Sequence, residues 1–167
     1  MFISGFIEES VVDGEGVRSV VFISGCRHHC QGCHNPETWS FAHGKPFTLD
    51  EQMNIINRVK DNPLIEGLTI SGGDPVYSSE EVIDFIKLYK RHFPEHSIWL
   101  YTGFTYEEVL EQHRDLLEEI DVLVDSLFDK SKQSYSCRFK GSTNQRVIDV
   151  KESLRLEDII IIPDKED

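Results

Sequence analysis

The stretch SGCRHHCQGCHNP occupies residues 24–36 and holds three of the four cysteines of the 167-residue chain, spaced Cys26-x3-Cys30-x2-Cys33. It directly follows the apolar run VVFI at residues 20–23, which is typical of a buried β-strand. Thiolates are soft ligands, and three of them on so short a loop suit zinc or an iron–sulfur cluster better than magnesium or calcium. The stretch therefore predicts a metal site on a loop that a rigid strand holds in place.

Two kinds of metal site are compatible with these cysteines. A structural zinc ion takes four ligands, so the three thiols with one of His28, His29 or His34 would complete a site. Structural zinc ligands usually arrive as two pairs, however, and the chain has no second pair. Three cysteines on a four-iron cluster leave one iron without a protein ligand, open to substrate, and the sequence favours this arrangement. Cys137 lies far along the chain and is expected to be a small, half-buried thiol that binds no metal.

Beyond this loop, strand-like and helix-like segments alternate. Strands are predicted at residues 18–23, 67–71, 97–101 and 120–124, with a further one at 2–7 beside the first and a fifth core strand at 146–150. Helices are predicted after Thr48, Ser78 and Thr105, each followed three residues later by the glutamate of a capping box. Residues 154–162 are apolar, and their structure stays open. The alternation predicts an α/β fold with a mostly parallel sheet and outer helices.

Unusual loops follow several of the predicted strands. They are the cysteine loop, Gly72-Gly73-Asp74-Pro75, Thr102-Gly103 and Asp125. In parallel α/β sheets the functional end is where strands stop and loops begin, so these loops are expected to converge in space. Two glycines after a strand let the backbone approach a ligand closely, and the aspartate beside them suits an ammonium group.

Composition narrows the class of protein. A formal net charge of −13 disfavours a surface for nucleic acid or anionic membranes, because phosphates are repelled. No apolar run approaches the roughly 20 residues of a membrane span, and the first residues lack the features of a secretion signal. The clustered cysteines do not resemble a disulfide framework, so a reducing cytoplasm is expected. The length predicts a single domain over residues 1–167, with a core at 10–150 and a C-terminal extension at 151–167.

The three-cysteine spacing after one strand, and the Gly-Gly-Asp-Pro loop after the next, resemble the radical S-adenosylmethionine superfamily. Further motifs narrow the resemblance: DGxGxR at 13–18, GCHNPxTW at 32–39, SGGDP at 71–75, WxYTG at 99–103, VxVD at 122–125 and RFKGSxNQR at 138–146. Over most of residues 10–150 the chain is similar to the glycyl-radical enzyme activases that serve anaerobic ribonucleoside-triphosphate reductase. The chain departs from that family at Ser126, where the family tends to have glycine.

This resemblance implies a [4Fe–4S] cluster on Cys26, Cys30 and Cys33, whose open iron chelates the amino and carboxylate groups of S-adenosylmethionine. The residues that it places against this cofactor are Gly32, Cys33 and His34, then Gly72, Gly73 and Asp74 around the methionine amino group, and Asp125 as a further contact. It also implies a partial (β/α) barrel of the radical SAM type, open on the side where a protein substrate enters.

The implied chemistry is an oxidoreductase reaction. The reduced cluster gives one electron to the sulfonium, and the 5′-deoxyadenosyl radical that results takes hydrogen from a glycine of the reductase. The implied partners are the glycyl-radical subunit of the reductase and an electron donor such as flavodoxin or a thioredoxin-type system, with no nucleic acid and no membrane. Two alternatives stay open: an activase of another glycyl-radical enzyme, such as pyruvate formate-lyase, and a zinc-binding interaction module without catalysis.

Overall fold

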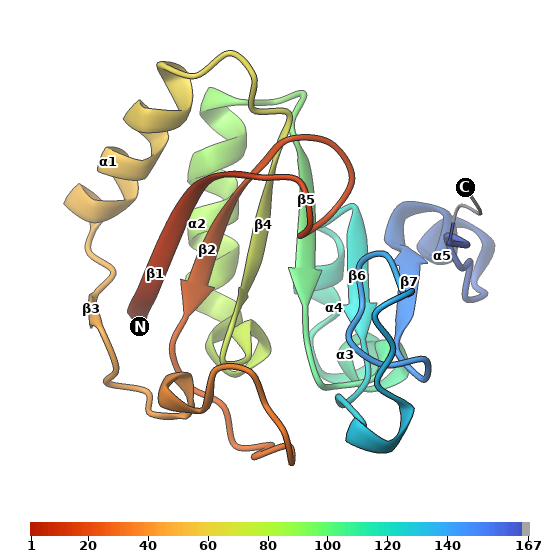
Figure 1. The fold of residues 1–167 in the computed structure, drawn as a ribbon. Helices are drawn as coiled ribbons and strands as arrows, with labels where there is room; N and C mark the ends of the chain where they lie inside the picture. The colour runs from red at the N-terminus through yellow and green to blue at the C-terminus, as the bar shows by residue number, and fades with distance from the viewer. Residues whose placement is uncertain (165–167) are drawn as a thin grey trace.

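The computed structural model of the protein describes residues 1–164, in which strands and helices alternate (Figure 1). The strands are β1 Phe2–Ser10, β2 Arg18–Ile23, β3 Lys45–Pro46, β4 Gly67–Gly72, β5 Ser97–Tyr101, β6 Val122–Asp125 and β7 Arg146–Asp149. The α-helices are α1 Leu49–Lys60, α2 Ser79–His92, α3 Tyr106–Gln112, α4 Arg114–Leu117 and α5 Val150–Leu156. Short 3₁₀ helices are η1 Pro36–Trp39, η2 Pro75–Ser78 and η3 Lys130–Lys132.

All seven strands form one sheet in the order β3-β1-β2-β4-β5-β6-β7. The central strands β2, β4, β5 and β6 are parallel and follow one another in chain order. The outer pairs β1–β2, β1–β3 and β6–β7 are antiparallel. The predicted mixed α/β fold is therefore confirmed, as is the strand that lies beside β2, while the parallel part of the sheet is restricted to its middle.

The two faces of the sheet are covered differently, because successive side chains of a strand point to opposite sides. Alternate strand residues such as Ile23, Ile70 and Leu100 pack in one apolar core with Ile56 of α1 and with residues of α2 and α4. The opposite face carries a smaller cluster of Trp99, Val122, Val124 and Val147, against which Phe139 and Ile162 pack. The helices thus pack on one face, and irregular segments cover part of the other.

Two of the three predicted helix caps are confirmed. The hydroxyl of Thr48 accepts a hydrogen bond from the Glu51 backbone N–H, and that of Thr105 accepts one from the Glu108 N–H. The prediction of a cap at Ser78 was wrong: the Ser78 side chain makes no capping hydrogen bond, and α2 begins at Ser79 directly after η2. Here Asp74 caps η2 by accepting from the Val76 N–H, so the chain is already helical when it reaches Ser78.

The C-terminal segment closes the β7 edge of the sheet. Residues 159–162, left open by the sequence, run beside β7, where Ile148 pairs with Ile161 and the Ile162 N–H donates to the Val147 carbonyl. The C-terminal extension is described as far as residue 164; residues 165–167 lie outside the described part of the chain. Among residues 1–164, no helix is both long and apolar enough to cross a bilayer.

Arg18 joins the first residues of the central strands. It is buried, and its guanidinium donates to Thr69 Oγ1 at 2.9 Å and to the Leu68 and Ser97 carbonyls at 2.8 and 2.6 Å. Burial lowers its pKa to about 10. Since these contacts lie where β2, β4 and β5 begin, they fix the end of the sheet opposite to the cysteine loop.

Candidate metal centre

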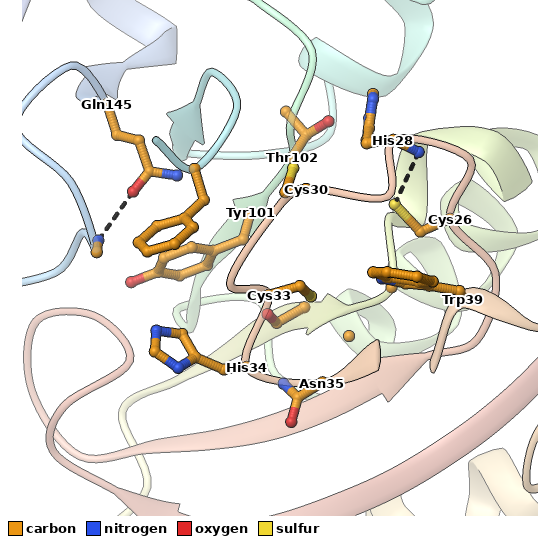
Figure 2. Close-up of a pocket in the computed structure, with 15 residues that line it drawn as sticks. Cys26, His28, Cys30, Cys33, His34, Asn35, Trp39, Tyr101, Thr102 and Gln145 are labelled. Atoms are coloured by element: carbon orange, nitrogen blue, oxygen red, sulfur yellow. Dashed lines mark hydrogen bonds between the residues drawn. The ribbon is translucent and has the colours of Figure 1, made fainter. Parts of the chain in front are cut away.

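The three clustered cysteines line one hollow where the parallel strands end, shown in close-up in Figure 2. The hollow has a volume of about 220 Å³. Other lining residues come from the loops that the sequence predicted to converge; they include His28, His34, Gly72, Gly73, Tyr101 and Thr102, with Phe128, Gly141 and Gln145 from the segment that joins β6 to β7. The predicted convergence is therefore confirmed for the cysteine, Gly-Gly and Thr-Gly loops.

The loop that carries the thiols is anchored through its backbone. The Gly25 N–H donates to the Thr38 carbonyl at 2.7 Å, and the Cys26 N–H donates to the Trp39 carbonyl at 3.1 Å. All four cysteines of the chain are free thiols; Cys26 is buried, and Cys30 and Cys33 are half-buried. These bonds fold the chain back on itself around the cysteines and hold them at the end of β2.

Burial raises the pKa of the Cys26 and Cys30 thiols. Backbone hydrogen bonds from His28 to Cys26 and from Phe128 to Cys30 partly offset this rise. The His28 N–H lies 3.4 Å from the Cys26 sulfur. Because metals bind the thiolate form, a metal that binds these thiols would displace their protons.

In the described part of the chain, the three cysteines are not placed around a single metal ion. Among residues 1–164, no three histidine, cysteine, aspartate or glutamate side chains are placed so that they could hold one metal ion. In a tetrahedral zinc site with bonds of about 2.3 Å, the sulfurs are only about 3.8 Å apart. A four-iron cluster binds each cysteine at a different corner and accepts a wider set. All three thiols line the same hollow.

The Gly72-Gly73 pair lets β4 pack directly on the backbone of the cysteine loop. Gly72 has a φ of +115°, and a Cβ on it would lie 2.3 Å from the Ile23 carbonyl oxygen. A Cβ on Gly73 would lie 2.7 Å from the Gly25 carbonyl oxygen and 2.6 Å from that of Thr38. The Gly73 N–H donates to the Ile23 carbonyl and the Asp74 N–H donates to the Gly25 carbonyl. Backbone hydrogen bonds therefore join the two loops.

We expect Gly73→Ala to reduce cluster content and to destabilise the apoprotein by about 1–3 kcal/mol, because the added methyl group pushes against main-chain atoms that cannot move independently. Urea unfolding and iron content after reconstitution measure the two effects. Gly5→Ala is the matched control, since its Cβ would meet only the Phe22 ring, at an ordinary 3.6 Å. Equal stability and equal iron content of the two variants would refute the packing role of Gly73.

Asp74 is buried beneath the hollow, and protein donors surround its carboxylate. His28 Nε2 lies 2.7 Å from Oδ2, the Gly103 N–H donates to Oδ2 at 2.9 Å, and the Thr102 hydroxyl lies 2.9 Å from both oxygens. The Val76 N–H donates to Oδ1 at 3.1 Å. The carboxylate thus connects the ends of β2, β4 and β5. Sequence reasoning offered His28 only as one of three alternative zinc ligands and did not find this partner, which lies 46 residues away.

Gly32 and His34 lie against the segment between β6 and β7. Gly32 has a φ of +78°, and a Cβ on it would lie 3.1 Å from the Lys130 side chain. The His34 ring lies 5.4 Å from that of Phe128, and both residues line the hollow. Gln145 holds this segment in place by accepting from the Gly141 N–H and donating to the Ser126 carbonyl. Cys137 lies on the same segment and is not among the residues that line the hollow.

Asp125 ends β6 but lies outside the residues that line the hollow. It is fully buried and accepts from Arg146 Nε at 3.0 Å and from the Tyr106 N–H at 2.7 Å. Arg146 also contacts Glu107, and these bonds raise the pKa of Arg146. Ser126 has a φ of +79°, a backbone conformation that glycine adopts more easily than serine.

The parallel strands with a thiol-lined hollow at their ends define a class of protein: a domain built around one iron–sulfur cluster. In agreement, the family model described as "4Fe-4S single cluster domain" matches residues 12–148.

Curated relatives narrow this class. The anaerobic ribonucleoside-triphosphate reductase-activating protein of Haemophilus influenzae is 41% identical over 138 residues, which cover 81% of this chain and 89% of that protein. Proteins of the same name from Enterobacteria phage T4 and Escherichia coli K12 are 36% and 37% identical, over 81% and 82% of this chain and 86% and 91% of their own lengths. The chain belongs to the family of anaerobic ribonucleoside-triphosphate reductase-activating proteins.

Proposed function

We propose that this protein is the activating enzyme of an anaerobic ribonucleoside-triphosphate reductase, on whose glycyl-radical subunit it generates the radical. The observation that carries the proposal is the meeting of three free thiols and the Gly-Gly-Asp-Pro loop around one hollow, in a chain of this family. Neither the activation of another glycyl-radical enzyme nor a zinc-binding interaction module has an observation of its own in its favour.

Cys26, Cys30 and Cys33 are the proposed ligands of a [4Fe–4S] cluster. When bound, this cluster supplies one electron that splits S-adenosylmethionine into methionine and a 5′-deoxyadenosyl radical, which takes a hydrogen atom from the reductase glycine. The protein holds the three thiolates, shields them by burial and donates backbone N–H groups to two of them. Electrons come from a donor such as flavodoxin or a thioredoxin-type system, in the reducing cytoplasm.

The Gly-Gly-Asp-Pro loop is the proposed binding site for the methionine amino group of S-adenosylmethionine. The N–H groups of Gly73 and Asp74 are already used, so this loop offers an ammonium group its carbonyl oxygens. The carboxylate of Asp74 already has four protein donors, as many as its lone pairs take, so it attracts the ammonium by charge and holds the loop in shape.

The other proposed cofactor contacts differ in how close they lie to the hollow. Cys33 and His34 line the hollow on the side of Phe128. Gly32 is not a lining residue but lies next to that side, where an added Cβ would be 3.5 Å from the Phe128 ring. Asp125, buried against Arg146, acts on the site through the loop that begins at Ser126.

We also propose that the sheet is a partial (β/α) barrel formed by a single domain. Two features support this: the central strands follow one another in chain order, and the apolar core with the helices lies on one face. A sheet of this kind curls around its other face, where the hollow opens toward a protein substrate.

The direct test is to incubate reconstituted, reduced protein with S-adenosylmethionine and the reductase, and to record the glycyl radical by electron paramagnetic resonance. A radical doublet on the reductase, absent without S-adenosylmethionine, is expected. Pyruvate formate-lyase serves as the alternative substrate. A radical on pyruvate formate-lyase alone would move the protein to that activase class, and a protein that binds zinc without sulfide would overturn the proposal altogether.

A further inference from the structure

His28 stands on the cysteine loop between two proposed cluster ligands, yet its side chain is engaged elsewhere. Its ring places Nε2 at 2.7 Å from Asp74 Oδ2, with the His28 side chain 13% exposed and that of Asp74 1% exposed. The Phe104 ring packs edge-on against it at 4.7 Å. These two contacts fix the orientation of the ring.

The partner of His28 is itself fixed by a third loop. Thr102 and the Gly103 N–H bind the same carboxylate from the end of β5. Gly103 also makes room for the ring, since a Cβ there would lie 2.8 Å from His28 Cδ2. The position of the imidazole is therefore set by two strand ends that do not carry the cysteines.

The backbone of the same residue faces a proposed cluster ligand. The His28 N–H donates to the Cys26 sulfur at 3.4 Å, one of the hydrogen bonds drawn in Figure 2. Hydrogen bonds to cluster sulfurs are among the factors that set the reduction potential of an iron–sulfur cluster, since they stabilise the more negative, reduced form. An N–H whose own side chain is anchored keeps its direction.

We propose that His28 is a positioning residue: its ring, held by Asp74, directs its backbone N–H at Cys26 and so couples the cluster's reduction potential to the Gly-Gly-Asp-Pro loop. The inference rests on the proposed function, because that loop is where the methionine amino group is expected. A ligand that shifts the loop then acts on the Cys26 sulfur through the Asp74–His28 bond.

The test compares two substitutions of His28 whose amide side chains differ in length. The amide nitrogen of glutamine lies about where Nε2 of histidine lies, so His28→Gln keeps the bond to Asp74, whereas His28→Asn is too short to make it. Midpoint potentials of the reconstituted cluster are measured without S-adenosylmethionine, and its dissociation constant is measured separately. We expect His28→Asn to have a more negative potential and about tenfold weaker binding, and His28→Gln to match the wild type.

Two further variants keep the test decisive. Thr102→Val removes the hydroxyl that bonds Asp74 and leaves His28 in place, so it should shift the potential in the same direction as His28→Asn but by less. If His28→Asn takes up no cluster, the potential of Thr102→Val tests the positioning role instead. His96→Phe is the matched control, because it removes a 2.8 Å histidine hydrogen bond, to Tyr89, among residues that do not line the hollow. Its potential should equal that of the wild type.

The outcomes separate this inference from the function on which it rests. Potentials of His28→Asn and Thr102→Val equal to the wild-type value, or an equal shift in His28→Asn and His28→Gln, would overturn the positioning role alone. A wild-type protein whose cluster does not respond to S-adenosylmethionine would instead refute the proposed function.

Discussion

Alanine at Cys26, Cys30 or Cys33 leaves the protein without its cluster: we expect each single variant, reconstituted anaerobically, to lose the iron and sulfide that the wild type binds. The reason is ligand number, because a cluster already one protein ligand short of four cannot be held by the two thiolates that remain. Iron and sulfide analysis, with the visible absorption of the cluster, measures the loss.

Cys137→Ala is the control for these variants. Its thiol is half-buried on the segment between β6 and β7 and does not line the hollow, so the variant is expected to bind iron and sulfide like the wild type. A full cluster in any of the three ligand variants would remove that residue from the site. Loss of the cluster in Cys137→Ala would make Cys137 part of the site.

Arg146→Met is expected to destabilise the apoprotein by about 3 kcal/mol, because it leaves the charge of Asp125 buried without its ionic partner. Asp125 is fully buried, while the Arg146 side chain is 29% exposed, and the N–H of Tyr106 remains as a donor. The measurement is urea unfolding of the metal-free protein.

Two variants isolate the buried pair from the outer one. Glu107→Gln removes only the exposed partner of Arg146, whose side chain is 57% exposed, and should cost less than about 1 kcal/mol. Combining Asp125→Asn with Arg146→Met removes both charges and should recover part of the loss. An Arg146→Met protein as stable as Glu107→Gln would show that Arg146 does not compensate the charge of Asp125.

Much of the fold was predictable because its signals are local. The apolar run before Cys26 is short and rich in β-branched residues, which favours a buried strand over a helix, and it is β2. Thr48 and Thr105 cap helices within their own three-residue reach. The loops met because the ends of parallel strands share one edge of the sheet.

What the sequence did not reveal depends on partners far along the chain. The direction of β7 is set by a long segment without an α-helix, and short apolar runs do not encode direction. The sequence around Ser78 matches a helix cap, but in the structure Asp74 caps η2 and the chain is already helical at Ser78. The bond between His28 and Asp74, and the packing of Gly73 on Gly25, join loops that become neighbours only once the sheet has formed.

The most direct test of the proposed chemistry is the electron paramagnetic resonance spectrum of the reduced, reconstituted protein, recorded with and without S-adenosylmethionine. We predict a [4Fe–4S]⁺ signal that changes when S-adenosylmethionine is added, because three cysteine ligands leave one iron for its amino and carboxylate groups. A cluster signal that S-adenosylmethionine leaves unchanged, or a colourless protein that binds one zinc ion and no sulfide, would contradict it.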